Sequence, residues 1–223
     1  PRNPNVSLND PFPADLISAG ITAGGVNPDL KISYMTQQNF SIQKEIGRAM
    51  VLEIGYAGSK GNSLLRSRNV NQAVLGSGSI ANRRPFGRFG NIGWLEDSAN
   101  SKYHSFQTRF DRRFIDGISL LGSYTWSKSI DDNSGSGGAA ETGGNFNNYD
   151  LKRERGLSAF DHRHRGTAAF MYQPQFGKSL TGVAGALARG WQFNGILTLS
   201  TGQPFTAALS GDVSLTGNGN DRP

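Results

Sequence analysis

Residues 102–131, KYHSFQTRFDRRFIDGISLLGSYTWSKSID, contain the pattern that decides the fold. Aromatic residues and a histidine share one parity from His104 to Phe114, and the other parity carries Ser105, Gln107, Arg109, Asp111 and Arg113. The alternation resumes from Ile118, after a short turn through Ile115-Asp116-Gly117. Successive side chains of a β-strand point to opposite faces, so a period of two predicts two strands, each with an apolar and a polar face.

The same alternation occurs in six segments of the chain. We expect strands over residues 32–46, 49–58, 102–114, 118–130, 162–173 and 190–201. A twelve-residue strand reaches roughly 40 Å, and strands in soluble domains usually have only about five or six residues. A membrane-spanning strand needs about 9–11 residues with strictly alternating faces. The predicted fold class is therefore all-β, an antiparallel up-and-down meander of about six long strands that forms part of a transmembrane β-barrel.

The links between these segments alternate in length. Short turns run through Gly47-Arg48 and Asp116-Gly117, and a medium link joins the last two strands. In outer-membrane barrels one rim carries short periplasmic turns and the other carries long extracellular loops. We therefore expect the extracellular loops to lie in the remaining segments, residues 1–30, 59–101, 131–161 and 202–223.

Composition narrows the class of protein further. The net charge of +6 over 223 residues is too small for a disordered tail, although glycine is abundant at 30 residues. No apolar run approaches the ~18 residues of a spanning helix. The absence of cysteine excludes disulfides and thiolate metal sites. Because Pro1 opens the chain without Met or a secretory signal, we expect the sequence to be part of a longer protein.

Catalytic and cofactor chemistry are not expected. The three histidines are His104, His162 and His164, and no Gly-x-Ser-x-Gly motif accompanies them. His162 and His164 share a strand face but lack an evident third metal ligand, and we interpret Asp161 to Arg165 as a strand at the membrane rim. The loop after Asp131 lacks a side-chain oxygen where a calcium loop needs one. The basic residues form no run of five or more, so no nucleic-acid partner is expected.

Parity also selects the residues expected to face a wet lumen. A Lys or Arg that faces lipid at the bilayer midplane costs about 2–4 kcal/mol, but only ~0–1 near the interfaces. The basic residues of lipid-facing parity, Lys44, Arg112 and Lys128, lie near strand ends. The candidates for contact with a solute are the polar residues of the opposite parity: Gln107, Arg109, Asp111, Arg113, Arg163 and Arg165.

One long link mixes cations with aromatic rings. Residues 83–95 contain three arginines, Arg83, Arg84 and Arg88, interleaved with Phe86, Phe89 and Trp94. The simpler interpretation is an extracellular loop that packs its own aromatic rings. The alternative is that Phe86, Phe89 and Trp94 contact a solute at the entrance through ring faces and cation–π interactions.

Several strings together resemble the barrel of TonB-dependent receptors of the Oar-like group. They are YHSFQ at 103–107, RRF at 112–114, SYTWSKSID at 123–131, ERGLS at 154–158, FDHRHR at 160–165, GWQ at 190–192, GIL at 195–197, GQPF at 202–205 and EIGYAGSKG at 53–61. The matches occur in the family's order over roughly residues 30–206.

That resemblance implies an outer-membrane channel of about 22 strands, closed by an N-terminal plug. Such a receptor takes up a large solute with energy from the TonB complex. Its partners would be outer-membrane lipid, the remainder of the barrel, the plug and, through the plug, the TonB complex. This sequence contains no recognisable plug, TonB box or final strand with a terminal aromatic residue.

The function expected from the sequence is a barrel segment of an outer-membrane receptor or transporter. It is not expected to be an enzyme or to hold a cofactor or metal. The alternative is a secreted all-β module that binds carbohydrate or mediates adhesion, in which the same strands would lie half-buried in a sandwich. The two differ in what covers the apolar face of the strands, which is lipid in a barrel and a second sheet in a sandwich.

Overall fold

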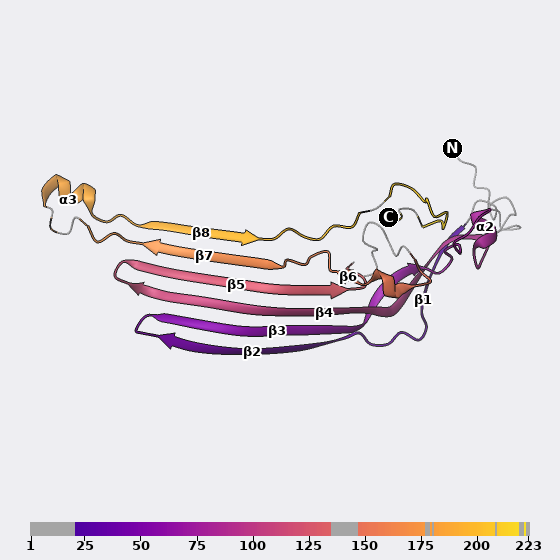
Figure 1. Ribbon diagram of the computed structural model, residues 1–223, viewed down its shortest axis with the longest axis horizontal. Coiled ribbons are helices and arrows are strands. Elements are labelled where there is room, and N and C mark those ends of the chain that lie inside the picture. The colour runs from indigo at the N-terminus through magenta and orange to yellow at the C-terminus, as the bar shows by residue number, and fades with distance from the viewer. Residues whose placement is uncertain are drawn as a thin grey trace, which may run out of the picture.

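The long strands form a single antiparallel meander. The computed structural model describes residues 21–134, 147–176, 179, 181–207, 209–218 and 221. Figure 1 shows the strands side by side in chain order, β2 (Tyr34–Ile46), β3 (Met50–Asn69), β4 (Phe89–Ile115), β5 (Ile118–Asp131), β7 (His164–Tyr172) and β8 (Phe193–Ser200). Each pairs antiparallel with the next, so the predicted all-β fold and six-strand meander are confirmed.

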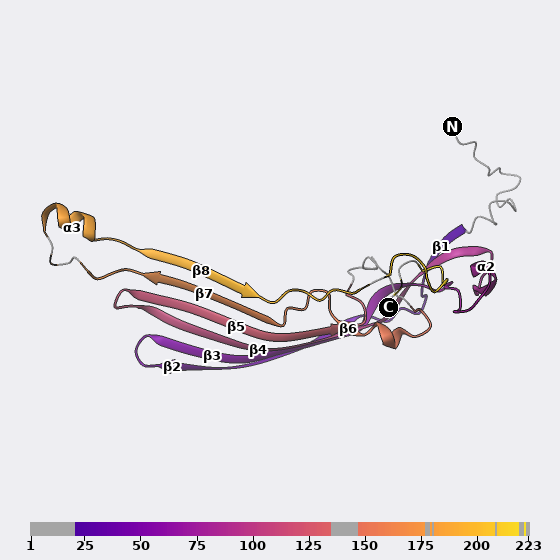
Figure 2. The same cartoon turned by 45° about the horizontal axis from the view of Figure 1, so that its top comes forward.

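The smaller elements lie at the two ends of the long strands. β1 (Ile21–Val26) pairs parallel with the beginning of β4, and β6 (Gly156–Leu157) pairs with the end of β5. The helix α2 (Ile80–Arg83) and the 3-10 turn η1 (Leu151–Glu154) lie at this same end, and α3 (Gly182–Ala188) lies at the opposite end (Figures 1 and 2). No helix within the described ranges has the length and hydrophobicity needed to cross a bilayer.

Short turns gather at one end of the sheet, as the alternating links predict. The turn between β4 and β5 consists of Asp116 and Gly117, both with positive φ, of 52° and 79°. Two positive-φ residues define a type I′ hairpin turn, whose twist matches that of the paired strands. The β2–β3 turn and the link that contains α3 lie at the same end, and the two longer links lie at the other (Figure 1).

The structure differs from the sequence prediction in the link expected over residues 59–101. β3 continues to Asn69 and β4 already begins at Phe89, so most of this segment is strand. The apolar alternation stops near Ser59, but the backbone ladder continues to the pair Asn69 and Gly93. Buried ion pairs accompany this extension, and no apolar stripe continues along it. The period-two pattern of apolar residues therefore does not predict these parts of β3 and β4. β1 likewise lies within the expected loop 1–30, and α3 within the medium link.

Within the described residues, the sheet has no covered hydrophobic core. Among the described residues, the buried apolar side chains are Ala73 and Ala99. The chain exposes 15392 Å², against about 9,900 Å² for a compact monomer of this mass. A soluble sandwich would pack a second sheet over the apolar side of these strands. In the described part of the chain the strands form one sheet and that side is exposed, so the structure favours a wall over a sandwich.

Candidate functional site

Register fixes which side chains share a face. Directly opposed residues of antiparallel strands project to the same side of the sheet. One side carries an unbroken cross-strand row, which we call the aromatic row: Phe40, Tyr56, Phe106, Trp126 and His164. Aromatic rings return on this side toward the short turns, where the rings of Tyr172 and Phe193 stack with centroids 6.5 Å apart. We call this side the outward face.

The separation of the two aromatic levels fits a membrane. On β5 the aromatic row lies at Trp126, and the strand begins eight residues earlier at Ile118, opposite Tyr172. Eight residues span about 27 Å along a strand, or about 20 Å along the membrane normal at the usual tilt of about 40°. The apolar band of an outer-membrane barrel is about 25 Å tall, with aromatic girdles at both edges. Between these levels the outward face carries Ile42, Leu52, Ile54, Phe110, Leu120, Ala168, Phe170, Leu197 and Leu199.

The opposite side, which we call the inward face, is polar in the two rows below the aromatic row, while the third row mixes Glu45 and Asp111 with Val51, Leu121, Ala169 and Ile196. Its cross-strand rows begin with Ser41, Gly55, Gln107, Thr125, Arg165 and Ser200. The next row toward the short turns contains Gln43, Glu53, Arg109, Ser123, Thr167 and Thr198. Each row crosses all six strands, so the polar positions of separate segments form one continuous surface.

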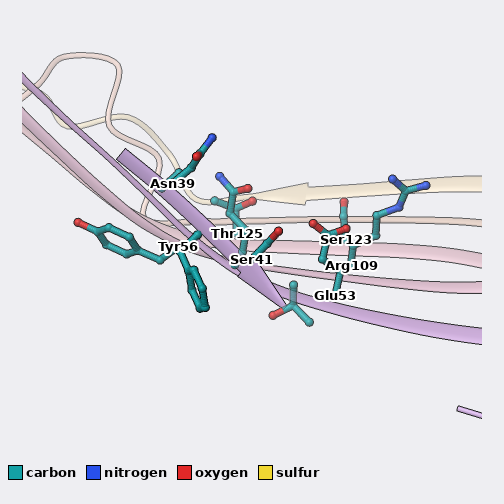
Figure 3. Close-up of a pocket in the computed structure, with 12 residues that line it drawn as sticks. Asn39, Ser41, Glu53, Tyr56, Arg109, Ser123 and Thr125 are labelled. Carbon is teal, nitrogen blue, oxygen red and sulfur yellow. The ribbon is translucent and has the colours of Figure 1, made fainter. Parts of the chain in front are cut away.

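A depression of about 670 Å³ lies on this polar surface. Its polar lining includes Asn39, Ser41, Glu53, Gln107, Arg109, Ser123 and Thr125. Figure 3 shows Asn39, Arg109 and Ser123 extending to one side of the strands while Tyr56 extends to the other. Hydrogen bonds and ion pairs order part of the lining. Arg109 Nη2 lies 3.6 Å from Asp111 Oδ2, and Gln107 Nε2 donates to Ser105 Oγ at 3.1 Å.

The lining offers hydrogen bonds and charges of both signs. Arg109 and Asp111 are only partly engaged, since 57% and 40% of their side chains are exposed. Glu53 directly opposes Arg109 across β3 and β4. Such a surface can bind a polar solute through several weak contacts.

The structure brings together four of the six residues predicted to contact a solute. Gln107, Arg109 and Asp111 follow one another on the inward face of β4, and Arg165 lies in the row of Gln107. Arg113 lies at the short-turn end, where its backbone N–H donates to Ala49 O.

Arg163 has a structural partner. It precedes β7, and its Nη2 lies 3.5 Å from Oδ2 of Asp161, whose side chain is 4% exposed. Asp161 Oδ1 also accepts the Ser129 backbone N–H, at 2.6 Å. This pair ties the link before β7 to β5.

The predicted loop aromatics do not form one cluster. Phe86 and Phe89 flank a turn in which the Phe89 N–H donates to Phe86 O. Trp94 lies within β4, where it opposes Gly25 of β1 and its ring packs over that glycine. A side chain at Gly25 would clash with the ring, because an added Cβ would lie 2.6 Å from it.

Sequence reasoning missed Glu53, Ser123 and Thr125 as members of the site. All three have the inward parity, on β3 and β5, whereas the six residues predicted to contact a solute lie on β4 and in or just before β7. The short turns fix the strand register, and this register places Glu53 and Ser123 directly opposite Arg109. Aligning the strands from their turns would therefore have identified these residues.

The two neighbouring histidines use their ring nitrogens within the fold. His162 Nδ1 lies 2.8 Å from Thr201 O, and His164 Nδ1 lies 2.8 Å from the hydroxyl of Tyr124. Within the described ranges, no three His, Asp or Glu side chains gather as metal ligands.

A solved structure, the outer membrane transporter YddB from Escherichia coli, aligns at a TM-score of 0.46 with 17% sequence identity, over 70% of this chain. The chain spans 20% of the length of that structure. No similar sequence is found among curated proteins.

A family profile described as "Outer membrane beta barrel domain" matches residues 1–223, the whole chain. A match of this extent assigns the alternating strands, the exposed apolar face and the polar inward face to the wall of a barrel. The chain therefore belongs to the outer membrane beta barrel domain family, and its place in the cell is the outer membrane.

Proposed function

We propose that this chain is a wall segment of an outer-membrane receptor that imports a large polar solute, of the TonB-dependent, Oar-like kind that its motifs resemble. The observation that carries the proposal is the polar inward face, whose rows cross all six strands and enclose the depression around Arg109. Arg109 and Asp111 keep about half of their side-chain surface exposed on this face, so they remain available to contact a solute.

The mixed charge indicates the class of solute. Arg109 and Arg165 can bind carboxylates or phosphates, and Glu53 and Asp111 can accept from amines or hydroxyls. Gln107, Ser123 and Thr125 add neutral hydrogen-bonding groups. This combination suits a peptide or an oligosaccharide better than an apolar solute. The segment makes and breaks no bond in this proposal, and a plug elsewhere in the protein would couple it to the TonB complex.

Uptake by cells tests the proposal. Strains with and without the full-length protein would be grown on a complex peptide and oligosaccharide medium, and depletion of each component would be followed by mass spectrometry. The protein should accelerate depletion of a defined set of solutes, and a protonophore should abolish the difference. If both strains deplete every component at the same rate, the transport proposal is wrong.

A substitution on the inward face tests whether this face contributes to transport. Arg109→Ala should raise the half-saturating solute concentration about tenfold, because a hydrogen bond to a charged group contributes about 1.5–3 kcal/mol. Arg112→Ala removes an arginine of the outward face on the same strand and should leave uptake unchanged.

A further inference from the structure

Three lysines gather on the outward face beyond the aromatic row, toward the long links. Lys60 of β3 directly opposes Lys102 of β4, and His104 of β4 directly opposes Lys128 of β5. Lys102 is also a diagonal neighbour of Lys128, because it opposes Ile130. All four basic side chains are exposed. We call this group the basic cluster: Lys60, Lys102, Lys128 and His104.

The depth of the basic cluster corresponds to the lipid headgroups. Lys102 lies four residues beyond Phe106, and Lys128 lies two residues beyond Trp126. At the rise and tilt of a barrel strand, these positions are about 5 to 10 Å above the aromatic row. The polar headgroup zone occupies about 5 to 8 Å on each side of the hydrocarbon core. The cluster therefore faces headgroups directly above the apolar band.

Like charges placed directly opposite each other destabilise a pair of strands unless an anion lies between them. Among the described residues, the lysines of the cluster form no ion pair. Two carboxylates that share a neighbouring groove with Lys60 and Lys102 have other contacts. Asp132 pairs with Arg66 at 3.0 Å, and both oxygens of the buried Asp131 accept from Ser134 Oγ at 2.8 Å. Neither carboxylate forms an ion pair with Lys60 or Lys102, so an anion bound between these lysines would stabilise the strand pair.

The cluster borders a groove that can hold a small anion. The groove, of about 370 Å³, is lined by Tyr34, Thr36, Gln38, Lys60, Lys102 and His104, among others. Gln38 Nε2 donates to Tyr56 Oη at 3.3 Å, and Tyr56 Oη lies 2.6 Å from His104 Nδ1. In the tautomer that carries its proton on Nε2, His104 accepts the Tyr56 hydroxyl at Nδ1 and can donate from Nε2 to a ligand.

We propose that the basic cluster binds a phosphate group of a phosphorylated glycolipid in the outer leaflet of the outer membrane. Two lysines placed opposite each other and a histidine N–H supply donors for a phosphate oxyanion. The acyl chains of the same molecule would lie along Phe106, Trp126 and the apolar band beneath them. A lipid is the occupant that suits this position, because the groove opens on the outward face at headgroup depth. The outer leaflet follows from the long links, which mark the extracellular rim of such barrels.

Lipid binding by the full-length protein tests this proposal. The purified protein in detergent would be titrated with diphosphoryl lipid A, and bound lipid would be counted by native mass spectrometry. The double variant Lys60→Gln/Lys102→Gln should weaken binding about 30-fold, given the usual gain per basic residue near an anionic membrane surface. Lys60→Arg/Lys102→Arg should restore binding, which separates lost charge from misfolding. The charge-matched control Lys31→Gln/Lys152→Gln changes exposed lysines elsewhere and should bind as the unaltered protein does.

Two further binding measurements identify which part of the glycolipid is recognised. The same glycolipid without its phosphates should bind no better to the unaltered protein than to the double variant. Millimolar inorganic phosphate should not displace the bound glycolipid, since the free ion lacks the acyl contacts. The proposal is wrong if the dephosphorylated lipid binds as well as the phosphorylated one, or if inorganic phosphate displaces the glycolipid. It is also wrong if the Lys→Gln and Lys→Arg double variants at positions 60 and 102 lose binding equally. The proposal depends on the membrane placement and not on solute uptake, so either can fail without the other.

Discussion

Buried charge is confined to one end of this sheet. Among the described residues, the buried charged side chains are Arg66, Glu96, Asp131 and Asp161, and all lie beyond the aromatic row. Arg66 is 1% exposed and contacts both a carboxylate oxygen and the backbone carbonyl of Asp132. Buried charges remain stable only when they are paired and hydrogen-bonded. Polar contacts, in place of an apolar core, therefore hold the extended ends of β3, β4 and β5 together.

Removing one partner of the Arg66–Asp132 ion pair should reveal the free-energy cost of leaving a buried charge unpaired. Asp132→Asn leaves the Arg66 guanidinium buried without its counter-charge, and we expect the free energy of unfolding to fall by about 3–5 kcal/mol. Urea unfolding of the full-length protein in lipid vesicles measures this change in the free energy of unfolding. Asp150→Asn is the control, because its partner Arg153 is 79% exposed, and exposed pairs contribute at most about 1 kcal/mol. Equal losses in the two variants would contradict this account.

Asn71 should control the order of the turn before β4. Its Nδ2 donates to the carbonyls of Phe86, Phe89 and Gly90, and its Oδ1 accepts the Phe86 N–H at 2.8 Å. Asn71→Ala removes these contacts from a fully buried position, so local opening should become easier by about 2 kcal/mol. Hydrogen exchange of the amides in residues 84–92 measures the change. Unaltered protection of the Phe86 amide would show that the side chain is dispensable.

At the scale of elements, the turn between β4 and β5 determines register. A slip of one residue would carry every side chain of β5 to the other face. Gly117 has a φ of 79°, and an added Cβ would lie 2.3 Å from Gln173 O. The Gln173 N–H also donates to Gly117 O at 2.7 Å, so this glycine joins the hairpin to the end of β7.

Gly117→Ala should therefore destabilise the sheet by about 1–3 kcal/mol, because it introduces both a strained φ and a backbone clash. Gly122→Ala is the matched control on the same strand, since nothing lies within 4 Å of an added Cβ there. That variant should change stability by less than about 0.5 kcal/mol. Both are measured by the same urea titration, and a larger loss for Gly122→Ala would refute the argument.

The sequence predicts the strands inside the apolar band well and their continuation poorly. Alternation at period two correctly separates Gln107 from Phe106, and short turns then align the rows across the sheet. The extension of β3 to Asn69 involves partners such as Arg66 and Asp132, which are 66 residues apart in the chain and show no periodic pattern. The packing of Trp94 over Gly25 is equally non-local, so residue types alone did not indicate it.

At the scale of the whole molecule, the sheet is an open wall. Within the described ranges, the outermost strands β2 and β8 each pair with one neighbour, which leaves one edge of each strand unpaired. Unpaired strand edges and an exposed apolar face promote association between chains.

Residues 1–223 expressed alone should therefore not give a soluble monomer. Without detergent, light scattering after size-exclusion chromatography should detect aggregates, because no second layer covers the outward face of the described sheet. A monodisperse, soluble monomer would instead support a self-contained module and contradict the wall.

The most direct test of the central claim is the accessibility of neighbouring residues to water. This segment contains no cysteine, so single cysteines can be introduced in pairs of adjacent residues. The pairs are Gln107→Cys with Phe106→Cys, and Ser123→Cys with Gly122→Cys, in the full-length protein without other reactive thiols and reconstituted in vesicles. A charged, membrane-impermeant maleimide should label the cysteines at 107 and 123 but not those at 106 and 122. A membrane-permeant fluorescent maleimide attached at 106 or 122 should instead be quenched by nitroxide lipids. Equal labelling within each pair, or labelling of 106 and 122 alone, would contradict a wall with water on one side and lipid on the other.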